Sequence, residues 1–266
     1  MEWHRLRSRI DQVSNDIEPR RPWRRYAVAL AAASVVAVAG YLGVRNTARQ
    51  VPEWRVVSTP AGGRATLRLE DSTVVTLGPS TTLRYALTLS RRDVALDGLA
   101  DFRVTHDAAR PFRVRARNAV TTDIGTEFVV RAYGSDSAVM VAVTAGAVRL
   151  ADTSNARAVT LEAGDVGNVS RMGVASQVAG VSATMGQAWM QGSLTFRNQP
   201  LGDVVLELDR WFDVDIRIAD SVLARKRVTA TYASPSLAGV LDAIGATTGA
   251  RYERNGRVVV MRRGDR

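Results

Sequence analysis

Few residues of this chain have the types and spacing that chemistry requires. Asp213 and Asp215 flank one residue on an expected strand edge, and paired carboxylates could act as a glycosidase acid and base. His106 is the one histidine beyond the N-terminal segment, and it lies in the polar stretch HDAARP, an expected loop. Ser80 lacks the following glycine of a nucleophile elbow. Since no pattern places a histidine beside a nucleophile, we predict no enzymatic activity.

Composition excludes several further classes of site. The chain has 266 residues, no cysteine and two histidines. It therefore has no disulfide, thiolate zinc site, iron–sulfur cluster or cysteine nucleophile, and no histidine cluster for a metal. Neither a phosphate-binding loop nor a dinucleotide-binding glycine string occurs. We expect no cofactor and no bound metal.

The charge of the chain is strongly basic, with 36 Lys and Arg against 26 Asp and Glu, a formal net charge of +10. Almost all of this charge is arginine, and Lys226 is the single lysine. The arginines are spread along the chain, mostly alternating with apolar residues, and no recognition motif accompanies them. This distribution favours a solvated, arginine-rich surface rather than nucleic-acid binding.

Residues 26–44 form an uncharged, apolar run of 19 residues. As a helix this run would be about 28 Å long, close to the thickness of the hydrocarbon layer. Four arginines in residues 20–25 precede it, and the positive-inside rule then places residues 1–25 in the cytoplasm. We predict one N-terminal transmembrane helix in the inner membrane, with the bulk of the chain periplasmic. A cleaved signal peptide, ending at the A-x-A-like residues 37–39, and a buried soluble helix are the alternatives.

The short segment 1–25 has an amphipathic pattern. Apolar residues recur at helical spacing and form one seam, and prolines at 19 and 22 end the pattern. A single helix of this length is marginal in water unless it binds a membrane, a copy of itself or a partner groove. The candidate partner-binding residues of the seam are Trp3, Leu6, Ile10, Val13 and Ile17. A basic leader that only sets topology is the alternative.

Residues 45–170 show short alternating runs that are typical of strands. Gly, Pro, Asn and Asp interrupt these runs every 8–12 residues or so, and no helical run of ten residues occurs among them. The pattern predicts an all-β sandwich or β-roll.

Several motifs in this region occur in a characteristic order. They include DSTVVTL at 71–77, VALDGLADFRV at 94–104, RPFRV at 110–114 and IGTEFVV at 124–130. The region resembles the FecR domain, the periplasmic sensor of FecR-type anti-sigma regulators. We interpret the motif residues as mainly structural, with Gly125 at a bulge or close backbone approach and Thr126 bonded to local backbone. The motif residues are Asp71, Leu77, Gly98, Phe102, Arg110, Pro111, Phe112, Gly125, Thr126, Phe128 and Gly146.

After an expected linker at 171–187, the pattern changes to mixed strands and helices over 188–266. Pro200 favours the start of a helix, and Ser234-Pro235 a second one that Gly249 ends. Asn255-Gly256 predicts a type I′ hairpin turn. The order is that of a small α+β domain, βαββαββ.

The C-terminal region resembles the short N-terminal domain of secretins and TonB-dependent receptors, a version of which commonly ends FecR-type proteins. Exposed edge strands of such a domain could accept a partner strand, and a purely stabilising domain is the alternative. The residues that carry the resemblance are Leu194, Phe196, Pro200, Leu201, Leu237 and Leu241.

Together, the resemblances imply a function in cell-surface signalling. They imply an inner-membrane regulator that receives a signal from the signalling domain of an outer-membrane TonB-dependent receptor and controls an extracytoplasmic-function sigma factor, as in iron transport regulation. The family carries a helical anti-sigma domain before the membrane, whereas this chain has 25 residues there. A misassigned start, a sufficient single helix and a lost anti-sigma function stay open. The alternative function is a periplasmic sensor or binding module, anchored or secreted, without sigma-factor control.

Overall fold

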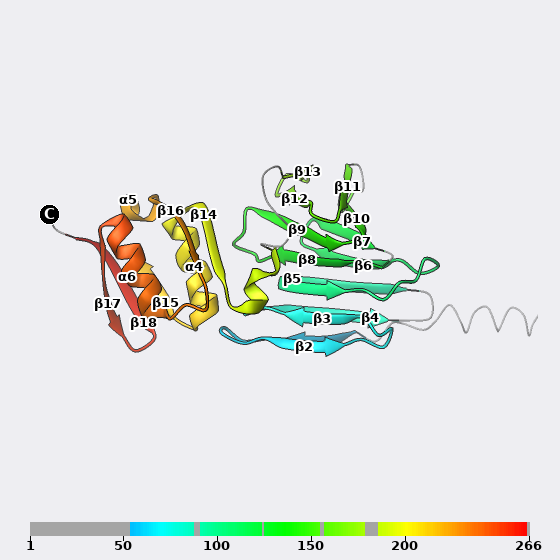
Figure 1. Cartoon of the computed structure of the whole chain (residues 1–266), viewed down its shortest axis with the longest axis horizontal. Coiled ribbons are helices and arrows are strands. Elements are labelled where there is room, and N and C mark those ends of the chain that lie inside the picture. Colours follow the sequence, from blue (N-terminus) through cyan, green and yellow to red (C-terminus); the bar gives the residue numbers. More distant parts are fainter. Residues whose placement is uncertain (1–53, 88–90, 124, 155–156, 179–185, 265–266) are drawn as a thin grey trace, which may run out of the picture. The chain divides into compact units, whose positions relative to one another are not determined.

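The computed structural model describes residues 54–87, 91–123, 125–154, 157–178 and 186–264 (Figure 1). The predicted cytoplasmic segment 1–25 and the predicted membrane helix 26–44 lie outside these residues. Within the described ranges, every helix is too short or too polar to cross a membrane.

The first part of the described chain, which we call the β domain, consists of strands joined by short turns. Short alternating runs explain the strands, because every second side chain faces the interior. The strands are β1 (Arg55–Ser58), β2 (Ala65–Arg68), β3 (Val74–Leu77), β4 (Thr82–Leu87), β5 (Arg92–Arg103), β6 (Phe112–Ala116), β7 (Ala119–Asp123), β8 (Glu127–Ala132), β9 (Ala138–Ala145), β10 (Ala147–Asp152), β11 (Ala158–Glu162), β12 (Val166–Ser170) and β13 (Ala175–Gln177).

Strand β5 belongs to two sheets at once. Its first half pairs with β4 and, in parallel, with β6, and its second half pairs with β3 and β8. The halves meet at Gly98, whose φ of 124° is unfavourable for residues with a Cβ. From this corner one sheet continues through β7, β10 and β11, and the other through β9, β12 and β13. This topology agrees with the β-rich domain that the sequence predicts.

The core of the β domain is built from side chains of both sheets. Phe102 stacks on Phe128 with ring centroids 5.3 Å apart, and Phe112 lies 6.0 Å from Phe102. All three phenylalanines are completely buried. Strand β13 lies inside the range 171–187 that we expected to be a linker, and it extends the second sheet by pairing with β12. The predicted linker 171–187 therefore begins too early in the chain.

The second part, residues 188–264, is the C-terminal domain, which contains strands and helices. Its strand and helix order is the expected βαββαββ with two added short helices, η1 before the first strand and α5 between β15 and β16. The elements are the 3-10 helix η1 (Ala188–Gln191), β14 (Leu194–Pro200), α4 (Leu201–Phe212), β15 (Asp215–Ile218), α5 (Ser221–Ala224), β16 (Arg227–Tyr232), α6 (Leu237–Thr248), β17 (Ala250–Asn255) and β18 (Val258–Arg263).

Two small sheets and the helices enclose the core of the C-terminal domain. Strands β14 and β16 form an antiparallel pair, while β18 pairs in parallel with β15 and antiparallel with β17. One face of α4 is buried in this core, as its 3.6-residue apolar period predicts. In Figure 1, α4 and α6 are the two long helices of this domain.

The ends of these elements confirm some expectations and correct others. Helix α6 ends at Gly249 in the left-handed conformation, as predicted, but its N-cap is Ser236 and not the Ser234-Pro235 pair. The side chain of Ser236 accepts a hydrogen bond from the N–H of Gly239, which explains the later start. The expected Asn-Gly turn is wrong by one position, because Asn255 pairs with Val258 and the turn residues are Gly256 and Arg257.

Candidate functional site

The two domains meet at a junction formed around Trp189 of η1. Trp189 is 6% exposed and belongs to a small apolar cluster of its own, separate from the two domain cores. The cluster draws its other members from both domains: Leu99, Val129, Tyr133, Met140, Ala142, Val166, Val178, Met190 and Trp211. Beside it, the side-chain amide of Gln187 donates hydrogen bonds to Asp101 (3.0 Å) and Thr144 (3.1 Å). Burial raises the pKa of Asp101, although the Gln187 bond opposes the shift.

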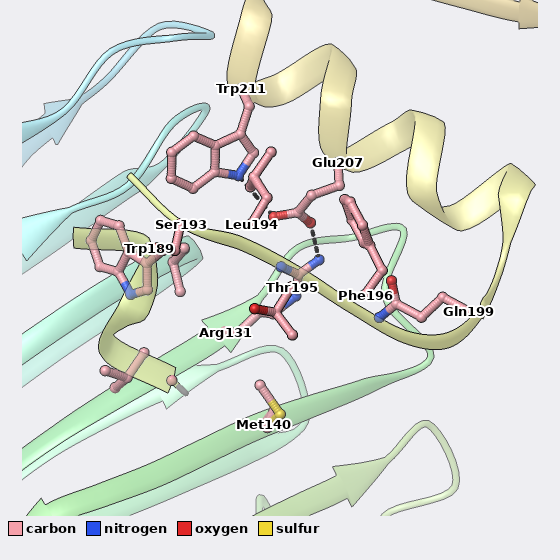
Figure 2. A pocket seen from close by; sticks show the side chains of 13 residues that line it. Arg131, Met140, Trp189, Ser193, Leu194, Thr195, Phe196, Gln199, Glu207 and Trp211 are labelled. Carbon is pink, nitrogen blue, oxygen red and sulfur yellow. Dashed lines mark hydrogen bonds and ion pairs between the residues drawn. The ribbon is translucent and has the colours of Figure 1, made fainter. Parts of the chain in front are cut away.

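Charged side chains close the junction on the side of α4 (Figure 2). The guanidinium of Arg131 on β8 donates to Glu207 at 2.5 Å and to Asp136 at 3.0 Å. Glu207, 8% exposed, also accepts from Arg210 (3.1 Å) and from the indole N–H of Trp211 (2.9 Å). The carboxylate thus links Arg131 of β8 to Arg210 and Trp211 of α4.

The environment of Glu207 keeps it ionised. Burial by itself raises the pKa of its carboxyl, but the charge and hydrogen bond of Arg131, then the charge of Arg210 and the Trp211 donor, lower that pKa to about 2. The guanidinium of Arg210 lies 4.1 Å from the ring centroid of Tyr133, whose pKa burial raises to about 12. Tyr133 donates its O–H to the carbonyl of Pro79 at 2.7 Å.

The loop before β2 completes the junction. The N–H of Gly62 donates to the carbonyl of Arg210 at 2.7 Å, and Arg64 donates to the carbonyl of Met190 at 3.1 Å. The Arg64 guanidinium also lies over the ring of Trp211, 4.6 Å from its centroid. Contacts from three parts of the β domain therefore hold the C-terminal half of α4.

A cavity of about 150 Å³ lies within this junction (Figure 2). Its lining includes Arg131 and Met140 of the β domain, and Trp189, Phe196, Glu207 and Trp211 of the C-terminal domain. Among the described residues, no acceptor lies within hydrogen-bond reach of the buried indole N–H of Trp189 or the Nε of Arg210. The junction is packed less completely than a protein core, in which buried polar groups are paired.

Comparison with known proteins identifies both domains. The family described as FecR protein matches residues 55–149, and the family described as FecR, C-terminal, matches residues 193–261. The chain belongs to the FecR family. No curated protein matches the chain significantly.

Solved structures resemble this FecR-family chain over both domains. Two crystal structures of a candidate anti-sigma factor from Parabacteroides distasonis, at 1.65 and 2.50 Å resolution, are each 29% identical to it. Their TM-scores are 0.73 and 0.74, and the matches cover 79% and 80% of this chain and 100% of each solved chain. These shares exceed either domain alone, so the similarity extends from the β domain into the C-terminal domain.

Most FecR-motif residues lie in or beside the core of the β domain. Leu77, Phe102, Phe112 and Phe128 are completely buried, and Pro111 directly precedes β6. Arg110 pairs with Asp107 in the loop before it, at 2.7 Å. These positions place the motif residues in packing and turn geometry.

Asp71 takes part in a buried ion pair that the sequence alone did not reveal. It accepts from Arg92 at 2.6 Å, and the Arg92 side chain is 1% exposed. Arg92 also donates to the hydroxyl of Thr73 and to the carbonyls of Thr105 and Arg110. The pair ties the turn between β2 and β3 to the beginning of β5.

Gly125, Thr126 and Gly146 meet at one end of the β domain. A Cβ at Gly125 would lie 2.6 Å from the His106 ring, which confirms the close approach expected there. The expectation for Thr126 is wrong: its buried hydroxyl has no hydrogen-bond partner among the described residues. The carboxylate of Asp123 instead accepts from the backbone N–H groups of Gly125 and Thr126.

The catalytic candidates do not assemble into a site. Asp213 caps α4 and pairs with Arg257, whereas Asp215 on β15 pairs with Arg217. Both carboxylates are about half exposed and each has its own arginine. His106 lies exposed in a loop. Asp213 and Asp215 therefore belong to two separate, solvated ion pairs.

The predicted residues of the C-terminal domain are internal, whereas the edges of its sheets are accessible. Leu194, Phe196, Leu201, Leu237 and Leu241 are buried, and Pro200 is the N-cap of α4.

The seam residues Trp3, Leu6, Ile10, Val13 and Ile17 lie outside the described residues.

The junction residues Arg131, Glu207, Arg210 and Trp211 were missed from the sequence. One signal was present: Glu207 is three residues after Val204, so it falls on the apolar side of α4. A buried carboxylate at this position requires a cationic partner. The helical pattern does not indicate which residue that is, because Arg131 lies 76 residues away in the sequence.

Proposed function

We propose that this FecR-family chain is an anti-sigma-type regulator anchored in the inner membrane by one helix at 26–44. Its two described domains lie in the periplasm, and the segment 1–25 binds a sigma factor of the extracytoplasmic-function type. The observation that carries the proposal is the match to a candidate anti-sigma factor over both domains, together with the two family matches. The uncharged run at 26–44 and its preceding arginines support the anchor.

The C-terminal domain is the part that we propose receives the receptor. Strands β14 and β16 pair only with each other, so each has one edge unpaired within the described residues. Edge β16 has exposed Thr229 and Thr231 and no charged residue after Arg227, whereas edge β17 carries Arg251, Glu253 and Arg254. Charged side chains discourage strand addition. The edge of β16 is therefore the better acceptor for a strand of a receptor signalling domain.

The sigma-factor arm is tested by crosslinking in intact cells and purification through a C-terminal tag. We expect a sigma factor to co-purify with the wild-type chain and to be lost after Leu6→Asp with Ile10→Asp, because both changes place charge in the apolar seam. Arg9→Gln, off the seam, is the matched control and should retain the sigma factor. Recovery of a processed, soluble periplasmic protein without a sigma factor would instead support the binding-module alternative.

The receptor arm is tested at β16. We expect Thr231→Lys to weaken binding of the receptor's isolated signalling domain by about tenfold, since a lysine on an edge strand opposes strand addition. Glu253→Lys on the edge of β17 is the control and should leave the affinity within about twofold. Calorimetric titration of the detergent-solubilised full chain measures both. Equal affinity in the wild type and Thr231→Lys would exclude β16 as the acceptor.

A further inference from the structure

Helix α4 belongs both to the core of the C-terminal domain and to the junction. Four residues of α4, Leu201, Val204, Val205 and Leu208, are buried in the core of the C-terminal domain. Glu207, Arg210 and Trp211 of the same helix contact the β domain. A displacement of α4 within its own domain therefore moves the Glu207 carboxylate relative to Arg131 on β8.

The packing of the junction is incomplete. It contains the cavity of about 150 Å³, lined in part by Trp189, and the unpaired N–H groups of Trp189 and Arg210 both lie in the junction. Unpaired buried donors and missing contacts penalise the docked arrangement, and regions with these features open before well-packed cores do. The penalty is local, because the cores on either side are formed by separate apolar clusters.

Arg131 has a second anionic partner, so its charge stays paired when its contact with Glu207 breaks. Its guanidinium is paired with Asp136 of the β domain as well as with Glu207, so it keeps one carboxylate if α4 moves away. Arg210 likewise contacts Ser135 of the β domain at 3.1 Å and Glu207 of its own helix. Opening the junction thus leaves neither arginine without an anionic partner, which lowers the cost of separation.

We infer that the Arg131–Glu207 contact is a releasable latch, and that a partner bound to the C-terminal domain acts on the β domain by shifting α4 and opening this junction. The inference rests on the proposed function for the identity of the signal, but the latch itself is a property of the two described domains. The two arrangements are docked and released, and the partner supplies the difference in binding free energy between them.

The absence of cysteine makes a single covalent lock possible. A Cβ built at Gly62 lies 3.9 Å from the Cβ of Asp213, within the 3.5–4.5 Å spacing of disulfides. Gly62 precedes β2 and Asp213 follows α4, so Gly62→Cys with Asp213→Cys would join the two domains across the junction. The reduced double variant is the control for the loss of the Asp213–Arg257 ion pair and for backbone strain.

The first measurement is hydrogen–deuterium exchange on the detergent-solubilised full chain. We expect Glu207→Gln to accelerate exchange by about tenfold at residues 186–194 and in α4, with the core strands β5 and β8 unchanged. Asp203→Asn, an exposed position on the same helix, should leave exchange unchanged. Oxidation of the double cysteine variant should slow exchange at the junction below that of its reduced form. Unchanged exchange in Glu207→Gln would overturn the latch.

The second measurement asks whether release carries the signal, in cells with the receptor and a sigma-dependent reporter. We expect the oxidised double variant to lose the response and each single cysteine variant to keep it. A full response from the crosslinked chain overturns the switch and leaves the proposed function intact. A wild-type chain without any response counts against the proposed function, and the exchange experiment then decides the latch alone.

Discussion

Asp71→Asn is expected to destabilise the β domain by about 3–5 kcal/mol, since it leaves the guanidinium of Arg92 buried without its carboxylate. Arg92 is 2% exposed, and its remaining acceptors are the hydroxyl of Thr73 and two backbone carbonyls. Neutral acceptors solvate the cation but do not balance its charge. Urea unfolding followed by far-ultraviolet circular dichroism on the full chain measures the loss as a lower midpoint with an unchanged slope.

The neighbouring residue offers the matched control. Glu70 pairs with Arg55, but these side chains are 49% and 62% exposed. Water screens such a pair, so Glu70→Gln should change the free energy of unfolding by less than about 1 kcal/mol. Equal effects of Asp71→Asn and Glu70→Gln would show that burial of Arg92 does not decide the energetics of this turn.

Gly98→Ala is expected to be at least as damaging. The added Cβ would lie 2.4 Å from the Oγ1 of Thr81, and the backbone there has φ of 124°. Thr81 cannot move away easily, because its hydroxyl accepts from the N–H of Leu99 and donates to the carbonyl of Pro79. Strain and overlap together should cost on the order of 3–5 kcal/mol.

Gly134→Ala separates this effect from the general consequence of replacing a glycine. No atom lies within 4 Å of a Cβ built at Gly134, so the change should stay within about 0.5 kcal/mol. The same unfolding experiment serves for both variants. A Gly98→Ala chain as stable as the Gly134→Ala chain would mean that the corner of β5 can form with a side chain present.

Sequence patterns predicted the features of this chain that depend on near neighbours. Alternation placed Phe102, Phe112 and Phe128 on inward faces, and helical spacing placed Leu201 and Val204 in a core. Such patterns report which face of an element is apolar, because each side chain's direction follows from its own backbone.

Features that depend on distant partners were not predictable in the same way. Arg92 is one of many arginines in the sequence, and its burial depends on Asp71, 21 residues earlier. Arg131 lies in the β domain, and its partner Glu207 lies in the C-terminal domain, 76 residues later. The apolar pattern of a strand or helix does not indicate which other element packs against it. The ion pairs between elements and the residues of the junction could therefore be identified only from the three-dimensional structure.

The shared strand β5 has a consequence for the order in which the chain becomes structured. Its partners β3 and β4 precede it, whereas β6 and β8 follow, and Gly98 pairs with Ala132. Strands β3 and β4 can join both sheets at β5 once residue 103 is available, but strand β8, the other partner of the second half of β5, extends to residue 132. Pairings of such long sequence separation are slow, because loop closure must precede the stabilising contacts. A chain cut within β8 therefore keeps the pairings of β3 and β4 with β5 but leaves the second half of β5 without its complete second neighbour.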